Sequence, residues 1–77
     1  MEIKILAFGP IKEITRWEEH LFQNILETDS LLKKLIDLFP DLEKFTFQMA
    51  VNSDIITQKT YLKNGDEIAL LPPFSGG

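Results

Sequence analysis

The sequence predicts an α+β fold in which one amphipathic helix covers one face of a mixed sheet of about five strands. Short runs of branched and apolar residues recur along the chain, with turn residues between them. One segment, residues 29–39, instead has its apolar residues at helical spacing. A length of 77 residues with 44% hydrophobic residues fits a single domain spanning residues 1–77.

The first two strands are expected near the N-terminus. Residues 3–8 are apolar and partly alternating, and Gly9-Pro10 ends them, which predicts a strand closed by a turn. Residues 11–15 are expected to form a helical turn. Residues 17–25 are expected to return as a second, antiparallel strand whose register stays open.

The main helix is expected over residues 29–39, with Thr28 as its N-cap. Pro40 ends it, because proline has no N–H for the helical hydrogen bonds and restricts the residue before it. Its apolar residues fall within an arc of about 140° and its charged ones lie opposite. The apolar set is Leu31, Leu32, Leu35, Ile36 and Phe39.

Three further strands follow the helix. Residues 45–51 and 55–57 are expected to form a hairpin around Asn52-Ser53-Asp54. The turn Asn64-Gly65-Asp66 precedes a last strand at residues 67–71. The order strand, strand, helix, strand, strand, strand is typical of a ubiquitin-like β-grasp, with the first and last strands side by side at the centre.

Composition excludes several classes of function. No cysteine is present, which excludes disulfides, thiol nucleophiles and thiolate zinc sites, and the single His20 cannot form a metal site alone. A chain this short has little room for a deep cleft, so we do not expect catalysis by this chain alone.

Charge and hydropathy narrow the partners and the location. The net charge of -4 is the wrong sign for neutralising phosphates, so nucleic acid is not an expected partner. No apolar run is long enough for a signal sequence or a membrane span. We therefore expect no membrane association and a cytoplasmic location.

The last six residues, Pro72-Pro73-Phe74-Ser75-Gly76-Gly77, suit neither a helix nor a central strand. The prolines favour an extended tail of about 20 Å, enough to carry the terminal carboxylate away from the domain. Two terminal glycines would fit a tunnel too narrow for a Cβ. The alternative is that the tail is an ordinary frayed terminus or linker.

The outer face of the sheet is expected to form a partner interface. Period-two alternation places Lys4, Leu6 and Phe8 on one face of the first strand and Glu67, Ala69 and Leu71 on one face of the last. The apolar members, Leu6, Phe8, Ala69 and Leu71, together with Ile55, form the expected interface. The alternative is that Phe8 and Leu71 cap the edge of the core.

Five other residues stand out, and four have structural explanations. Trp17 is expected to pack rather than bind, and His20 to be a partly exposed strand residue. Turn chemistry explains Asp66, and Glu67 is expected to be solvated, although both could face a basic surface on a partner protein. Phe74, an aromatic residue in an extended tail, suits an anchor pocket on a partner.

The whole chain resembles the small subunit of molybdopterin synthase, a family of ubiquitin-like sulfur carriers. The closing Leu71-Pro72-Pro73-Phe74-Ser75-Gly76-Gly77 is the most specific match. The chain departs from the family at Lys12, where arginine is frequent, and over residues 15–29. Other matching residues are Ile3-Lys4-Ile5-Leu6, Phe8, Lys12-Glu13, Ala50-Val51-Asn52 and Gly65-Asp66-Glu67.

The resemblance implies a mechanism. An ATP-dependent activating enzyme adenylates the carboxylate of Gly77, and a sulfur donor protein converts it to a thiocarboxylate. The tail then enters a larger subunit, which builds the dithiolene of molybdopterin from a cyclic pyranopterin precursor. The chain would be a non-catalytic donor that binds no cofactor itself, in an assembly of two small subunits flanking a dimer of large ones.

Three alternatives stay open. A carrier for thiamine or another thiolated product would use the same chemistry, but thiamine carriers usually lack the proline pair. A ubiquitin-like modifier would join Gly77 to a lysine of another protein. A plain β-grasp binding module would have an inert tail.

Overall fold

Strands and helices alternate along residues 1–72, the part of the chain that the computed structural model describes. The strands are β1 (Glu2–Ala7), β2 (Glu19–Gln23), β3 (Gln48–Val51), β4 (Asp54–Ile56) and β5 (Glu67–Leu71). The helices are α1 (Gly9–Thr15), α2 (Thr28–Leu38) and the short 3-10 helix η1 (Pro40–Lys44). The order matches the predicted one, and η1 is an addition to it.

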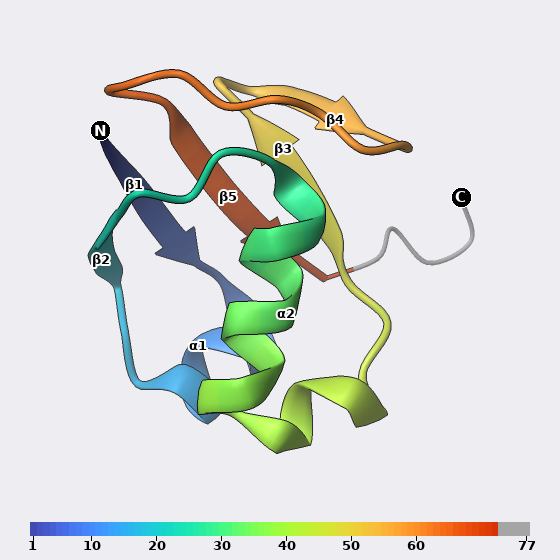
Figure 1. Ribbon diagram of the computed structural model, residues 1–77. Helices are drawn as coiled ribbons and strands as arrows, with labels where there is room; N and C mark the ends of the chain where they lie inside the picture. Colours follow the sequence, from blue (N-terminus) through green and yellow to red (C-terminus); the bar gives the residue numbers. More distant parts are fainter. Residues whose placement is uncertain (73–77) are drawn as a thin grey trace.

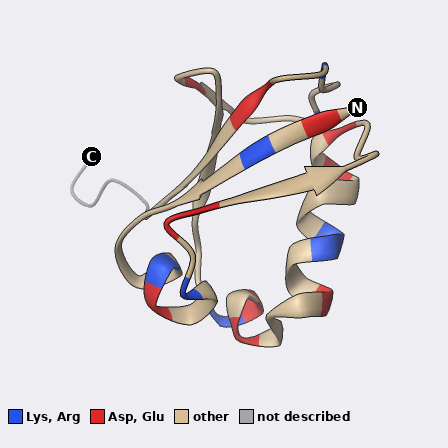
Figure 2. Cartoon of the chain, turned by 90° about the vertical axis from the view of Figure 1, so that its left-hand side faces the viewer, with Lys and Arg blue, Asp and Glu red and all other residues tan. Residues whose placement is uncertain are grey.

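The five strands form one mixed sheet in the order β2-β1-β5-β3-β4. The predicted central pair is confirmed, because β1 and β5 run parallel and side by side, with Ile5 opposite Ile68 and Leu6 opposite Ala69. The β-grasp architecture follows from this pairing: α2 crosses one face of the sheet (Figure 1), and no helix of residues 1–72 covers the other face (Figure 2).

The core lies between α2 and the inner face of the sheet. Alternation along β1 and β5 sends every second side chain inward, and the inward ones are buried. Leu31 and Leu35 of α2 pack against them and are fully buried. The inward residues of the two central strands are Ile3, Ile5, Ala7, Ile68 and Leu70.

The predicted N-cap of α2 was wrong by one residue. Glu27 is the cap, and its carboxylate accepts hydrogen bonds from the backbone N–H groups of Asp29 at 2.8 Å and Ser30 at 3.2 Å. The longer side chain of glutamate thus accepts from the free N–H groups of the first turn, as serine, threonine or aspartate does at other N-caps. The Thr28 hydroxyl instead accepts from the N–H of Thr60 at 3.0 Å, which ties the helix to the segment before β5.

Two predicted strands were too long. Trp17 precedes β2, and its ring stacks on His20 at 4.0 Å and meets Phe39 edge-on at 4.9 Å, so tertiary packing takes it out of the strand. Phe45 follows η1 and lies outside β3. His20 is a partly exposed strand residue, as predicted.

A polar network joins the β3–β4 turn to the start of β5. Asn52 and Ser53 form the turn with φ values of 49° and 75°. The Asn52 amide donates to Asp66 at 2.9 Å and accepts from the N–H of Glu67 at 3.0 Å. The N–H of Lys63 also donates to Asp66, at 2.8 Å. These bonds fix the place where the last strand enters the sheet.

This network makes stability depend on pH. The hydrogen bond from Asn52, and then that from the Lys63 N–H, hold the pKa of Asp66 below its ordinary value of 3.8. A lowered pKa stabilises the fold above the unfolded value, and this stabilisation is lost as pH falls through the folded value. Asp66→Asn should therefore cost at most about 1 kcal/mol at neutral pH, since the group is partly solvated.

The measurement is urea unfolding of both chains from pH 7 down to pH 2. The difference between wild type and Asp66→Asn should shrink as the solution becomes more acidic than pH 3.8. Asp37→Asn removes the same charge from the exposed side of α2 and is the control. A difference that stays constant over the whole range would show that Asp66 acts through something other than its charge.

Candidate functional site

The site begins where β5 leaves the sheet. β5 is flanked by β1 and β3, so the chain departs from the middle of the sheet at Leu71 and Pro72. The N–H of Phe8 donates to the Leu70 carbonyl at 3.2 Å, which extends the pairing by one residue beyond β1. The end of β5 is thus held on both sides, and the chain leaves the sheet from a fixed point (Figure 1).

Five of the predicted site residues, Pro73, Phe74, Ser75, Gly76 and Gly77, lie outside the described residues. Their roles stay predictions. Pro72, the first residue of the predicted tail, is described and exposed.

The predicted interface residues share the uncovered face of the sheet. Leu6 lies opposite Ala69, Ala69 opposite Ala50, and Ala50 opposite Ile55, so one apolar row crosses four strands. Leu71 points the same way as Ala69 by alternation, opposite Gln48. Phe8 and Ile55 are each 45% exposed. This set, Leu6, Phe8, Ile55, Ala69 and Leu71, is called the outer patch below.

The alternative interpretation of Phe8 and Leu71 as caps of the core edge is not favoured. Phe8 is outside the buried core cluster and retains nearly half of its exposure, and Leu71 is only partly buried. An apolar row on a solvated face is the kind of surface that a partner covers.

Sequence reasoning missed two residues of this face. Leu21 on β2 lies opposite Lys4 and is 49% exposed, so it extends the apolar surface toward the sheet edge. Alternation with the buried Phe22 could have placed Leu21 on the outer face, but the sequence did not fix which residues of the second strand face outward. Ala50 lies between Ala69 and Ile55 in this row; the sequence marked it as part of a predicted strand and as a match to the family, but not as an interface residue.

Charged side chains surround the outer patch. Lys4 and Glu67 face each other across β1 and β5, one row before Leu6 and Ala69. Lys4 also lies 3.9 Å from Glu19 of β2. As predicted, Asp66 is accounted for by turn hydrogen bonds and Glu67 is exposed.

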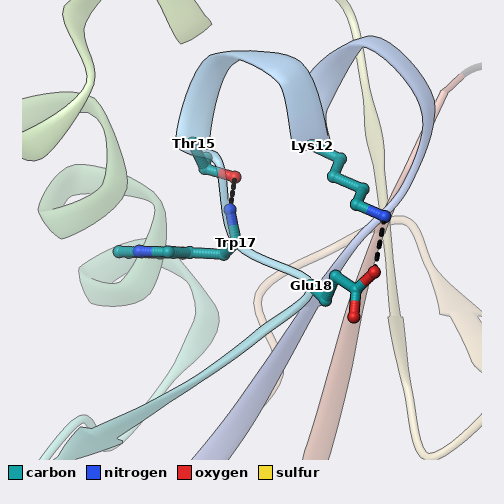
Figure 3. A network of polar contacts seen from close by, with 4 residues as sticks. All are labelled: Lys12, Thr15, Trp17 and Glu18. Atoms are coloured by element: carbon teal, nitrogen blue, oxygen red, sulfur yellow. Dashed lines mark hydrogen bonds and ion pairs between the residues drawn. The ribbon is translucent and has the colours of Figure 1, made fainter.

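A shallow hollow of about 460 Å³ lies beside the point where the chain leaves the sheet. At its side the Lys12 ammonium and the Glu18 carboxylate are 2.9 Å apart (Figure 3). The hydrogen bond from Lys12 is the main cause that holds the pKa of Glu18 below its ordinary value. The lining residues are Leu6, Ala7, Phe8, Gly9, Lys12, Glu18 and Glu19.

The residues between α1 and β2 fix the position of Glu18. The N–H of Trp17 donates to the Thr15 hydroxyl at 3.2 Å, and Thr15 is buried. Figure 3 shows the Trp17 ring directed away from the Lys12–Glu18 pair. Trp17 therefore packs, as predicted, and its neighbour Glu18 is left facing Lys12.

Within residues 1–72, no arrangement of side chains suggests a catalytic or metal centre. No group of three or more histidine or acidic residues in this part could hold a metal ion. A larger hollow of about 480 Å³ between α2 and the β3–β4 hairpin is lined mostly by apolar residues and threonines, with no histidine. None of the helices described is long and apolar enough to cross a membrane.

Comparison with known proteins identifies the family. The model of the ThiS family matches residues 5–77. This chain belongs to the ThiS family. The match includes β1 from Ile5 onward, all of β5, the outer patch and the closing glycines of the sequence.

One curated relative and two solved structures show what this chain is similar to. A molybdopterin synthase sulfur carrier subunit from Chlamydomonas reinhardtii is 35% identical over 83 residues, covering 100% of both chains. A chain in the complex of subunits 1 and 2 of molybdopterin-converting factor from Helicobacter pylori is 30% identical, with a TM-score of 0.72 and 100% of both chains covered. The small archaeal modifier protein 1 from Methanosarcina acetivorans is 26% identical, with a TM-score of 0.80 over 99% of this chain and 96% of that one.

Proposed function

We propose that this chain is the sulfur carrier subunit of a molybdopterin synthase. One observation carries the proposal: the central strand β5 runs directly into Pro72-Pro73-Phe74-Ser75-Gly76-Gly77, in a chain that matches such carriers over its full length. The domain supplies a rigid base, and the closing residues supply the reacting group.

The reacting group is the terminal carboxylate of Gly77. An ionised carboxylate is a poor electrophile, because its ordinary pKa is near 3.5 and neither oxygen is a leaving group. Adenylation with ATP on an activating enzyme makes AMP the leaving group, and sulfide-level sulfur from a donor protein then displaces AMP to give a thiocarboxylate. Because the chain has no cysteine, this acyl group is its one covalent position for carrying sulfur.

The other closing residues guide the tail into a partner. Gly76 keeps the end of the chain narrow, since it has no Cβ. Pro72 and Pro73 restrict the unbound chain, so less entropy is lost when it becomes ordered on docking. Phe74 fills an apolar pocket of the partner, and Ser75 passes into the channel with the glycines.

The proposed main partner is the large subunit of the synthase. The Helicobacter pylori structure is a complex of subunits 1 and 2 of molybdopterin-converting factor, which supports a partner of this kind. The outer patch is the surface we assign to it, because it is apolar and adjoins the residues from which the tail starts. Two copies of this chain on a dimer of large subunits would give a heterotetramer in the cytoplasm.

Conjugation to proteins is the second candidate. The observation that raises it is the similarity to a protein named small archaeal modifier protein 1. It predicts covalent products larger than the free chain, joined through Gly77 to lysine side chains. Such products in an extract of the host, absent when Gly77 is deleted, would support this second function.

Tandem mass spectrometry of the C-terminal peptide, from protein isolated from its native host, tests the carrier function. We expect sulfur in place of one oxygen at Gly77. Fragmentation is needed because oxidation of Met1 or Met49 adds nearly the same mass. A plain carboxylate during sulfur-replete growth, with the activating enzyme present, would contradict the proposal.

A further inference from the structure

The larger hollow borders the edge of the sheet on the side that α2 covers. β4 is the last strand in the order β2-β1-β5-β3-β4 and, among the described residues, pairs only with β3 (Figure 1). Ile56 of β4 and the residues just after it line the hollow of about 480 Å³, and α2 lines it from the other side. The hollow therefore lies between a helix and the edge strand of the sheet.

The backbone of Ile55 has hydrogen-bonding groups that point away from β3. Val51 and Asp54 flank the two-residue turn of the hairpin and so form a hydrogen-bonded pair. Ala50 and Ile55 are the next pair, which in an antiparallel ladder exchanges no hydrogen bonds. The N–H and C=O of Ile55 therefore face the free edge, and within residues 1–72 no hydrogen bond outside the strand pairing reaches them.

Apolar side chains lie where a strand added to β4 would place its inward side chains. Leu32 and Ile36 are one turn apart on α2, and Ile56 lines the hollow from the sheet. Leu32 is 36% exposed and Phe45, at another side of the hollow, is 45% exposed. Because side chains alternate along a strand, every second residue of an added strand would enter the hollow and cover this surface.

Two carboxylates favour a basic partner. Asp29 and Glu43 line both this hollow and a neighbouring one on the surface of α2, and neither forms an ion pair with a residue of the described part. Lys33 lines only the neighbouring hollow. Lys59 is the one basic residue, among those described, that lines the larger hollow, and its ammonium lies 5.5 Å from the centroid of the Tyr61 ring.

We propose that these two hollows and the free edge of β4, together called the α2–β4 groove, bind an extended segment of a partner protein. The segment adds a strand to β4 through the N–H and C=O of Ile55. Its apolar side chains contact Leu32 and Ile56. A lysine or arginine on the same face of the segment pairs with Asp29 or Glu43.

Two other occupants fit the groove less well. The closing residues of this chain, 72–77, begin with two prolines, which donate no backbone hydrogen bond, and contain no lysine or arginine. A second copy of the chain carries the same net charge of -4, which opposes its approach to the carboxylates. The groove lies on the α2 side of the sheet, so a segment bound there leaves the outer patch open to another protein.

A synthetic peptide tests the groove. The probe is a capped heptapeptide with lysine, isoleucine, valine and lysine at alternate positions and threonine between them, titrated into the full chain. We expect saturable binding that is lost when both lysines are replaced by glutamate. No saturable binding, or equal binding of the glutamate peptide, would overturn the proposal.

Matched variants of the chain locate the contact. Leu32→Ser should weaken peptide binding by at least about tenfold, because it truncates an apolar contact in the hollow. Leu38→Ser is the control, since Leu38 is 47% exposed on α2 but lines neither hollow. Glu43→Gln should weaken binding, and Glu13→Gln, on the exposed side of α1, should not. Urea unfolding verifies that each variant folds, and equal effects within either pair would overturn the proposal.

Amide hydrogen exchange tests the added strand. On peptide binding, exchange at Ile55 should slow because its N–H gains an acceptor. Exchange at Ile56 should change much less, since its N–H already bonds to β3 in the pair with Met49. Unchanged exchange at Ile55 under saturating peptide would overturn strand addition at β4. None of these measurements needs an activating enzyme or sulfur transfer, so they succeed or fail independently of the proposed function.

Discussion

Deletion of Gly76 and Gly77 should abolish sulfur transfer and leave the free energy of unfolding unchanged. The core cluster of the described residues is complete without the closing glycines, which have no side chain to bury, so we expect the fold not to depend on them. The deletion moves the carboxylate back by about 7 Å, onto Ser75, which has a side chain. Because acyl transfer requires close alignment of the reacting atoms, we expect a rate loss of at least about a thousandfold.

Gly77→Ala is the matched variant for this deletion. It keeps the length of the chain and adds one methyl group at the reacting residue. A lower transfer rate in this variant would therefore show that the partner's channel excludes a Cβ, separately from any effect of tail length. The assay is thiocarboxylate formation with the purified activating enzyme and sulfur donor, followed by transfer. Undiminished transfer by the shortened chain would mean that the tail is inert and that the domain acts as a plain binding module.

Replacement of Phe8 by serine should weaken binding to the large subunit by about 10- to 100-fold. Phe8 is the largest side chain of the outer patch and is 45% exposed in the free chain, so it is available to a partner. Truncation of a buried aromatic anchor at an interface typically costs about 2 kcal/mol or more, and each 1.4 kcal/mol is roughly tenfold in Kd. Ile55→Ser, at the β4 end of the apolar row, should have a smaller effect in the same direction.

Leu38→Ser is the control for this series. Leu38 is 47% exposed but belongs to α2, on the opposite side of the sheet from the outer patch (Figure 2). It therefore removes comparable apolar surface without touching the proposed interface. Isothermal titration calorimetry gives Kd for each variant. Equal weakening by Phe8→Ser and Leu38→Ser would show that the outer patch is not the binding surface.

The central architecture could be predicted from the sequence because the signals there are local. Alternation in residues 3–8 and 67–71 identified the two central strands and their outer faces, and Pro40 marked the end of the main helix. The paired positive φ values at Asn52 and Ser53 agree with the predicted hairpin turn.

The errors arose where tertiary contacts override local preference. The Thr28 hydroxyl accepts a hydrogen bond from the N–H of Thr60, so Glu27 caps the helix instead. Nothing in the sequence around Glu27 and Thr28 reveals this distant partner. The aromatic residues 17–25 resemble one long strand, but Trp17 stacks on His20 and contacts Phe39 after the helix. The same uncertainty hid Leu21, whose face depends on the register of β2.

The proximity of Gly9 and Pro72, which follow the central strands β1 and β5, was also beyond sequence reasoning. Gly9-Pro10 indicated a turn, and the proline pair indicated an extended tail, but neither pattern places one beside the other. The parallel pairing of β1 and β5 does so, because it brings the residues after both strands to the same end of the sheet.

A single-turnover transfer reaction tests the central claim most directly. Chain carrying a thiocarboxylate at Gly77 is mixed with the large subunit and the cyclic pyranopterin precursor, and both products are followed by mass spectrometry. We predict that molybdopterin forms with two thiocarboxylates consumed for each dithiolene, and that the chain returns to a plain carboxylate. An unchanged precursor in the presence of active large subunit, with the thiocarboxylate retained or spent on protein lysines, would contradict the account.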